Sequence, residues 1–302
     1  MTEPADVTGL DADEAIEAIE TAREEVMLDP YRSGQTIELQ AGSELWVTGD
    51  LHDHRGNFRK LLAAADLANN PRRHLLLHEL IHGSYFDESG AEDSWKMLYQ
   101  ACVLKADFPE QVHFVLANHD LAQIHGEGIS KAGLNVCEAF TKALKRDFES
   151  RYSTVEMAIT EFYLALPLAV RTPGGTFVCH SLPTDQQLGD FDFSVFERET
   201  LSNADYKRKD GPVYQLIWGR NISPESAERF AEHVNAQVLI TGHQPQDNGF
   251  AVNGDKHLIV ASDHNQGMFL PLSTDETYTM DTLTDRLRRF VAVDPDDPST
   301  FE

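Results

Sequence analysis

The chain has 302 residues, with 25 lysines and arginines against 50 aspartates and glutamates, so its formal net charge is -25. A surface this acidic repels phosphate backbones and anionic headgroups, which excludes a broad electrostatic grip on nucleic acid or on a membrane surface. The length allows one large domain with insertions or two smaller domains.

Cysteine content and hydropathy exclude a disulfide-rich protein and a protein that spans a membrane. The three cysteines, Cys102, Cys137 and Cys179, lack metal-type spacing, so we expect small core residues and no disulfide framework. No apolar stretch approaches the roughly 18 to 20 residues that span a bilayer, and the N-terminus is acidic where a leader would be basic. We therefore expect a cytoplasmic protein that does not act at membranes.

Helical periodicity predicts an N-terminal helix over residues 11–28. Asp11 can cap it, and Glu14 falls at the position that completes a capping box. Because the segment is densely acidic, we expect a peripheral helix on the domain edge, with a partner-binding arm as the alternative.

Strands and helices alternate through the next part of the chain. Apolar runs predict strands at 45–48, 75–77 and 112–116, and helical spacing predicts helices at 58–67 and 95–104. The alternation predicts an α/β fold with helices on the faces of a sheet.

The second half begins with a mostly helical stretch, 121–165. A hairpin, 164–171 and 176–179 around Pro173-Gly174-Gly175, then delivers His180 at its far end. A polar surface excursion (183–212) and a strand (238–241) follow, and two runs, 258–260 and 268–270, read as strands that pair with each other. We divide the chain into an acidic N-terminal helical extension (1–40), a catalytic domain (41–274) and a partly disordered C-terminal tail (275–302).

Five polar clusters follow the apolar runs, so after folding they would meet where the strands end. They are Gly49-Asp50-Leu51-His52, His78-Glu79, Asn118-His119-Asp120, His180, and Gly242-His243. Carboxylates, an amide and imidazoles in one place suit two divalent cations that share a bridging carboxylate. Histidine nitrogens favour manganese, iron or zinc over magnesium or calcium.

His119 lies beside a ligand-type residue but can point toward a substrate, and Asp120 could accept the proton of its ring. That pair would make a general acid for a leaving alkoxide. His264 also follows a predicted strand, and we expect a structural role for it.

The motif order GDLH, a carboxylate at a strand end, ANHD, VCHS and TGHQP resembles the calcineurin-like metallophosphoesterase superfamily over residues 45 to 270. The last motif is similar to the Ser/Thr phosphoprotein phosphatase branch. The resemblance implies a two-layer mixed β-sandwich flanked by helices. It also implies hydrolysis of phosphate esters by a metal-bound hydroxide, without a covalent intermediate.

Carried over residue by residue, the resemblance implies that Asp50 and His52 hold the first metal and that Glu79 bridges to the second. The second metal would be held by Asn118, His180 and His243. His119 with Asp120 would form the catalytic pair, and Arg220, in Ile217-Trp218-Gly219-Arg220, would bind phosphate. The expected cofactors are two ions of manganese, iron or zinc, with manganese favoured in vitro. The expected substrates are phosphoserine or phosphothreonine proteins or small phosphate esters.

The second motif departs from the family pattern GDxxDRG. Here His78 replaces the glycine, Glu79 replaces the bridging aspartate, and the phosphate-binding arginine is absent. Arg220 remains, with His82 or Arg55 as substitutes. A non-catalytic phosphate- or partner-binding homologue is therefore one alternative.

A zinc metallopeptidase is the other alternative. Residues 78–82 spell HELIH, which fits the HExxH pattern and requires a helix. Gly83 interrupts such a helix directly after the second histidine, and a peptidase would leave the other four clusters without a role.

Overall fold

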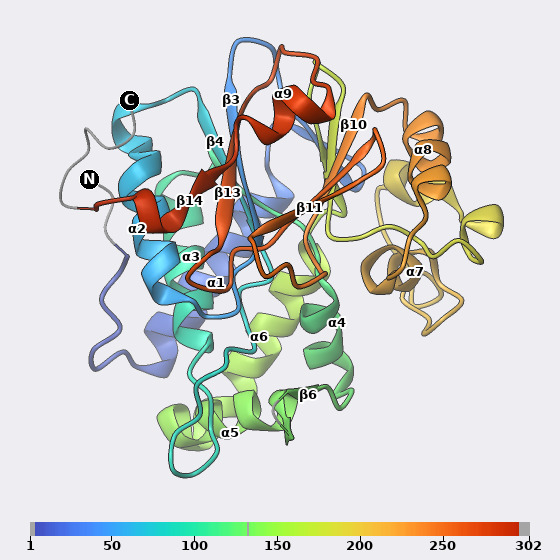
Figure 1. The fold of residues 1–302 in the computed structure, drawn as a ribbon. Helices are drawn as coiled ribbons and strands as arrows, with labels where there is room; N and C mark the ends of the chain where they lie inside the picture. Colours follow the sequence, from blue (N-terminus) through green and yellow to red (C-terminus); the bar gives the residue numbers. More distant parts are fainter. Residues whose placement is uncertain (1–3, 132, 296–302) are drawn as a thin grey trace.

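The computed structural model describes residues 4–131 and 133–295, and two facing β-sheets form its centre (Figure 1). The larger sheet has the strand order β1 (Arg32–Ser33), β2 (Thr36–Glu38), β8 (Ala169–Arg171), β9 (Thr176–Cys179), β10 (Val238–Thr241), β12 (His257–Val260) and β11 (Phe250–Asn253). The smaller has the order β14 (Arg288–Arg289), β13 (Met268–Ser273), β3 (Glu44–Asp50), β4 (Arg73–His78) and β5 (Val112–Phe114). A separate hairpin consists of β6 (Ser130–Lys131) and β7 (Leu134–Asn135).

Both sheets contain a parallel group of strands. In the smaller sheet β4 lies parallel to β3 and to β5, and in the larger sheet β10 lies parallel to β9 and to β12. The carboxyl ends of each group therefore meet at one edge. An isolated parallel bridge between Asp50 and Ala261 joins the two sheets there.

Apolar side chains fill the space between the sheets. Val47 and Leu76 from the smaller sheet pack in one cluster with Val178, Ile240 and Val260 from the larger. Because side chains alternate along a strand, the neighbouring residues of β3 and β4 face outward and contact helices. Each fully buried Val or Leu contributes about 1.5 to 3 kcal/mol, so this layer fixes how the two strand groups lie against each other.

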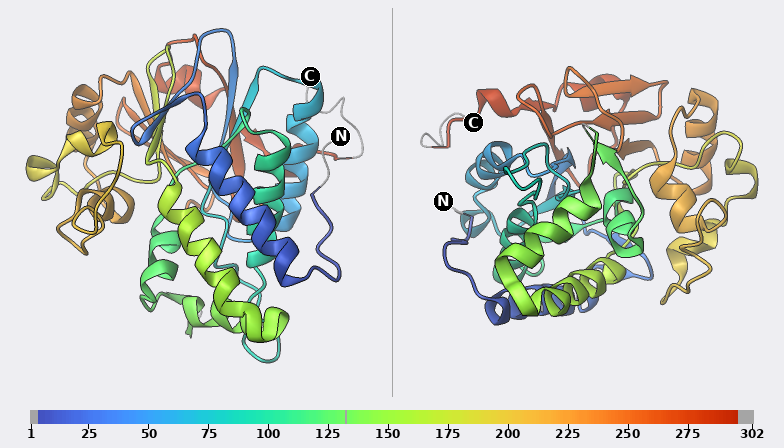
Figure 2. Two further views of the ribbon diagram at one scale, coloured as in Figure 1. Left: turned by 180° about the vertical axis from the view of Figure 1, so that it is seen from behind. Right: turned by 90° about the horizontal axis from the view of Figure 1, so that it is seen from below.

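Helices cover the outer faces of both sheets (Figures 1 and 2). One group lies outside the smaller sheet and below the sandwich: α1 (Ala12–Met27), α2 (Arg55–Ala65), α3 (Trp95–Asp107), α4 (Asn118–His125), α5 (Val136–Phe148) and α6 (Tyr152–Ala165). On the side of the larger sheet lie α7 (Pro212–Trp218) and α8 (Pro224–His233), and α9 (Met280–Thr284) follows β13. Short 3-10 helices complete the elements: η1 (Leu67–Asn69), η2 (Glu149–Arg151), η3 (Leu188–Asp190), η4 (Phe193–Glu197) and η5 (Phe290–Ala292). This arrangement confirms the predicted α/β class and its two-layer mixed sandwich.

The N-terminal helix is part of the helical layer. The predicted capping box is present, since Asp11 accepts from the Glu14 amide and the Glu14 side chain accepts from the Asp11 amide. Ala15, Ile19 and Val26 are buried where α1 crosses α3 and α6, as Figure 2 shows. The apolar stripe of this helix is thus covered by its own chain.

The predicted pairing of 258–260 with 268–270 is wrong. β12 pairs with β10 and β11, whereas β13 crosses to the other sheet and pairs with β3. The turn between them carries the chain across: the Ser262 hydroxyl donates to the Met268 carbonyl at 2.6 Å and accepts from the Gly49 amide at 2.9 Å. The predicted hairpin at 164–179 is confirmed, because β8 and β9 pair antiparallel.

The division into an extension, a domain and a tail stays a prediction. Both flanks contribute to the sheets, since β1 and β2 extend the larger sheet and β14 pairs with β13. Phe290 is fully buried, and residues 296–302 of the expected tail lie outside the described residues. All three cysteines are buried as free thiols, and none of the described helices is long and apolar enough to cross a membrane.

The buried ring of His257 should make the stability of the fold sensitive to acid. Its ring is fully buried and contacts the Thr241 hydroxyl at 2.9 Å, and burial lowers its pKa to about 4. A histidine with a lowered folded pKa contributes stability above the unfolded value of about 6.5, and that stability is lost as the pH falls toward 4. We expect the free energy of unfolding to fall by about 2 to 3 kcal/mol between pH 7 and pH 4.5 from this residue. Urea unfolding with a chelator present should show a smaller fall in His257→Gln, and an equal fall would contradict the assignment.

Candidate metal centre

The predicted ligand residues lie together at the edge where the two strand groups end. Asp50 ends β3, Glu79 follows β4, Asn118 begins α4, His180 follows β9 and His243 follows β10. These five side chains are at most 9% exposed, and His52 lies in the loop after β3. Residues from both sheets thus meet in one polar pocket, as the strand-end pattern predicts.

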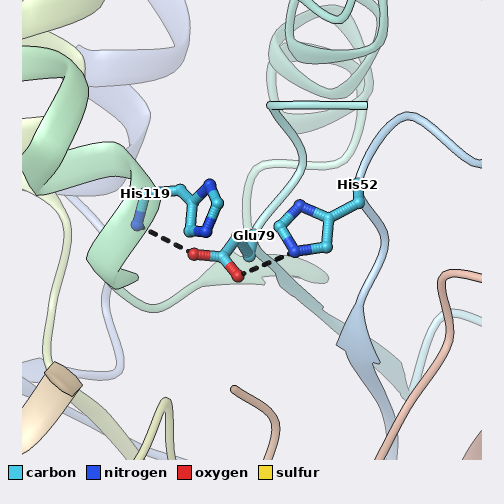
Figure 3. A group of neighbouring side chains, drawn as sticks. All are labelled: His52, Glu79 and His119. Carbon is cyan, nitrogen blue, oxygen red and sulfur yellow. Dashed lines mark hydrogen bonds and ion pairs between the residues drawn. The ribbon is translucent and has the colours of Figure 1, made fainter. Parts of the chain in front are cut away.

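Glu79 lies between His52 and His119 (Figure 3). Its Oε2 lies 3.3 Å from Nε2 of His52, and its Oε1 accepts from the His119 amide at 2.8 Å. Two sets of ligand atoms, each within 4.8 Å of one another, include it: His52, Glu79 and His119, and Asp50, Glu79 and His180. One carboxylate therefore belongs to two adjacent candidate cation sites.

Asn118 connects the remaining histidines. Its Oδ1 accepts from Nε2 of His180 and from Nδ1 of His243, both at 2.8 Å, and the His243 amide donates to Asp50 at 2.9 Å. Among the described residues, Nδ1 of His180 and Nε2 of His243 are buried without a hydrogen-bond partner. A buried unpaired ring nitrogen costs about 1 to 3 kcal/mol. Divalent ions fit such donors, because they would coordinate the free lone pairs.

The backbone at this edge is held in unusual conformations. His52, Glu79, His82 and His243 have positive φ angles between 37° and 66°, which few residues other than glycine adopt. Such strain costs about 1 to 3 kcal/mol per residue and gathers at functional sites. It turns side chains of the loops after the strands into the pocket.

Two glycines allow the close approach. A Cβ at position 49 would lie 1.9 Å from the Val260 carbonyl oxygen, and one at position 242 would lie 2.4 Å from the Asp50 carboxylate. Larger residues at these positions would separate the two sheets at the pocket.

Burial perturbs the titration of the pocket strongly. Burial raises the pKa of Asp50 to about 6, and burial with the neighbouring charges of Asp50 and Asp120 raises the pKa of Glu79 well above its usual range. Burial lowers the pKa of His52 and of His243 to about 3. Crowded carboxylates beside neutral imidazoles form an environment that favours bound cations.

The predicted contact between the His119 ring and the Asp120 carboxylate is wrong. Asp120 Oδ2 accepts from the Ala117 amide at 2.9 Å and so caps α4, whereas Nδ1 of His119 lies 2.9 Å from Nδ1 of His82. Successive residues of a helix point about 100° apart, so the two side chains diverge. His82 is therefore the contact of the His119 ring.

Of the two residues predicted to substitute for the missing arginine, His82 is too deeply buried and Arg55 stays a prediction. His82 is 0% exposed, which leaves it no access to a substrate phosphate. Arg55 is held by Asp53 through two contacts, Nε to Oδ1 at 3.0 Å and Nη2 to Oδ2 at 2.9 Å. Half of its side chain is exposed, so a role of Arg55 in phosphate binding stays a prediction.

Two other cations face the pocket. Arg220 is exposed in the loop after α7, and its charge lowers the pKa of both Asp50 and His243. Lys131 of β6 donates to the His82 carbonyl at 3.2 Å. Burial lowers the pKa of His119 well below its usual value, and the neighbouring His52, His82 and Lys131 lower it further. Lys131 could not be predicted from residue spacing, because it follows no predicted strand and only packing brings its hairpin to the His82 carbonyl.

The HExxH alternative is wrong. Residues 79–82 are not helical, and the positive φ of Glu79 is incompatible with a helical turn there. His78 Nδ1 lies 2.6 Å from the Thr48 carbonyl, inside the sheet, whereas His82 contacts His119. The two histidines therefore cannot hold one zinc ion as a peptidase motif does. His264 is held by backbone groups, the Gln246 carbonyl and the Gln266 amide.

Comparison with known proteins agrees with this geometry. The sequence pattern of the calcineurin-like phosphoesterases matches residues 44–247, more than half of the chain and a range that contains every predicted ligand. The chain belongs to this family. Its membership confirms the resemblance inferred from the strand-end motifs.

The proteins that this chain is similar to are phosphatases by name. A probable serine/threonine-protein phosphatase of Encephalitozoon cuniculi is 22% identical over 238 residues, which cover 72% of this chain and 46% of that protein. The chain thus spans about half the length of that curated relative. A solved serine/threonine phosphatase from Saccharomyces cerevisiae superposes with a TM-score of 0.68 at 17% identity, covering 94% of this chain and 91% of that one. A cold-active protein tyrosine phosphatase superposes with a TM-score of 0.51 at 11% identity, covering 86% and 84%. These two structures share the fold.

Proposed function

We propose that this calcineurin-like phosphoesterase is a metal-dependent phosphatase with a dinuclear centre, acting on phosphoserine or phosphothreonine proteins or on small phosphate esters. The observation that carries the proposal is the position of Glu79, which belongs to two adjacent groups of ligand atoms. A shared carboxylate is what a pair of ions about 3.5 to 4 Å apart requires.

Each pocket residue has a role in this proposal. Asp50 and His52 would hold one ion, and Asn118, His180 and His243 would hold the second, with Glu79 between them. Asp50 is also grouped with His180, so its carboxylate would lie near both ions. When bound, the ions would neutralise phosphate charge and lower the pKa of water at the site. We assign to His119 the transfer of a proton to the leaving oxygen, because its ring lies beside His52 and Glu79.

The phosphate would be held locally, since the net charge of -25 opposes long-range attraction of anions. Arg220 is exposed and close enough to influence Asp50 and His243. Arg220→Met should weaken inhibition by inorganic phosphate and raise KM by roughly ten- to a hundredfold, the effect of one charge-assisted hydrogen bond. Steady-state kinetics should show no such change in Arg229→Met, an exposed arginine of α8. Equal KM values in Arg220→Met and the wild type would remove Arg220 from phosphate binding.

The function is tested by metal content and hydrolysis together. After incubation with manganese and removal of the excess, inductively coupled plasma mass spectrometry should find close to two manganese ions per chain. The same protein should hydrolyse p-nitrophenyl phosphate, lose activity to a chelator and regain it with manganese. Two ions without hydrolysis of this ester or of phosphopeptides would support the non-catalytic alternative, and absence of bound ions would overturn the dinuclear centre.

The substrate class needs a separate comparison. Phosphoserine and phosphothreonine peptides, a phosphotyrosine peptide and a small ester should be assayed at one enzyme concentration, and we expect the first two to give the highest kcat/KM. A cytoplasmic location belongs to the same proposal.

A further inference from the structure

The ring of His119 is one end of a chain of hydrogen bonds that leads away from the metal centre. Its Nδ1 lies 2.9 Å from Nδ1 of His82, and Nε2 of His82 lies 3.0 Å from Oε1 of Gln123. The Gln123 amide nitrogen donates to the Thr141 hydroxyl at 3.2 Å, and that hydroxyl donates to Glu156 at 2.9 Å. The four contacts connect the loop after β4 with α4, α5 and α6.

The carboxylate of Glu156, at the outer end of this chain, determines which group donates the proton in each hydrogen bond. A carboxylate only accepts, so the Thr141 proton goes to Glu156 and the Thr141 oxygen accepts from the amide of Gln123. The Gln123 carbonyl then accepts from Nε2 of His82. The His82 ring is fully buried, and its ring nitrogens contact the neutral groups of Gln123 and His119, so the ring is neutral and its Nδ1 keeps only a lone pair. That lone pair can accept only from a protonated Nδ1 of His119.

The direction of the bonds selects one tautomer of His119. With its proton on Nδ1, the ring leaves Nε2 for the pocket, where His52 and Glu79 lie. Nε2 is then the nitrogen that can take up a proton from solvent and pass it to a leaving oxygen, while Nδ1 keeps the proton that it donates to His82. The ring of His82 cannot turn to a different partner easily, because it also packs edge-on against Phe140.

We propose that His82, Gln123 and Thr141 are positioning residues that hold His119 in the tautomer whose Nε2 faces the metal centre. The catalytic part of this inference rests on the proposed phosphatase function. The tautomer itself does not, because it follows from the hydrogen bonds and from the neutral state of the buried His82 ring.

The outer end of the chain of hydrogen bonds can be altered with little risk to the fold. Gln123, Thr141 and Glu156 are partly exposed and line an open groove of about 840 Å³. The same groove contains Thr160, whose hydroxyl donates to the Glu156 backbone carbonyl and takes no part in the chain. Thr141→Val and Thr160→Val are therefore a matched pair, and Gln123→Met breaks the chain one link further in.

Nitrogen-15 NMR of histidine-labelled, metal-free protein tests the tautomer directly. The signals of His119, assigned by their loss in His119→Asn, should show a protonated Nδ1 and an unprotonated Nε2 in the wild type and in Thr160→Val. Thr141→Val and Gln123→Met should show a mixture of both tautomers. A protonated Nε2 in the wild type, or unchanged signals in both variants, would overturn the proposal.

Leaving groups of different basicity test the catalytic consequence. With ions bound, Gln123→Met should lower kcat for phenyl phosphate by roughly ten- to a hundredfold, since general acids contribute about 10² to 10⁴. The kcat for 2,4-dinitrophenyl phosphate, whose leaving group needs no proton, should stay within about threefold of the wild type, with KM and metal content unchanged. Equal losses for both esters would reject positioning in favour of a general structural effect. Failure of the wild type to hydrolyse either ester would reject the phosphatase function and leave the NMR result to decide the tautomer.

Discussion

Glu79→Gln should leave fewer than two ions per chain and lower kcat by about a thousandfold or more. The substitution keeps the length of the side chain but removes the charge that both candidate cation sites share. Losing the Lewis-acid contribution of an ion removes several kcal/mol of transition-state stabilisation, and each 1.36 kcal/mol is about tenfold in rate. Plasma mass spectrometry and steady-state hydrolysis of p-nitrophenyl phosphate would measure the two effects.

The same substitution should stabilise the metal-free protein. Burial and the charges of Asp50 and Asp120 raise the pKa of Glu79, which means that its carboxylate is unfavourable there without cations. A neutral amide avoids that cost, so the metal-free Glu79→Gln protein should melt at a higher temperature than the metal-free wild type. A lower melting temperature would mean that Glu79 contributes to folding in a way the geometry does not show.

Two further variants identify the cause of the loss. Glu79→Asp keeps the charge but withdraws it by one methylene, so we expect it to lose the contact with the His119 amide and to bind the ions more weakly. Glu44→Gln alters an exposed carboxylate at the opposite end of β3, beside Arg73, and should retain both ions and full turnover. If Glu79→Gln retained two ions and wild-type turnover, the shared-carboxylate centre would be wrong.

The position of this centre could be read from the sequence because the relevant pattern is local. An apolar run followed directly by polar residues marks a strand and the loop that leaves it, as at Val47 to Asp50 or Ile240 to His243. Parallel strands then bring those loops to one edge without any knowledge of the helices. The ligand residues meet for this reason.

Side-chain directions and sheet membership could not be read in the same way. The contact between His82 and His119 depends on the positive φ of His82 and on the capping role of Asp120, neither of which leaves a mark on residue spacing. β13 resembles a hairpin partner of β12, yet the free edge of β3 accepts it. Lys131 reaches the pocket only because α4 and α5 hold its hairpin there. These features are set by tertiary packing, which propensity and periodicity do not contain.

His119→Asn should lower kcat by about 10² to 10⁴ while KM and metal content change little. A proton delivered to the leaving oxygen stabilises the transition state and not the bound substrate, so its absence should lower kcat and leave KM nearly unchanged. The control is His125→Asn on the same helix, whose ring lies 3.8 Å from Glu127 and belongs to neither group of candidate ligand atoms, and it should behave as the wild type. Turnover equal to the wild type in His119→Asn would remove this histidine from the mechanism.

Metal content in His119→Asn distinguishes an acid from a ligand. The His119 ring lies within 4.8 Å of ligand atoms of His52 and Glu79, so the same position could serve either role. If His119 is an acid, its loss should leave both ions in place and lower kcat for phenyl phosphate far more than for 2,4-dinitrophenyl phosphate. Only the first leaving group is too basic to depart without a proton. As a ligand, its loss should remove an ion and slow both esters alike. Nδ1 of His119 is directed at His82, so Nε2 would act in either role. The ratio of the kcat values for the two esters, together with the number of ions per chain, therefore decides whether His119 is an acid or a ligand.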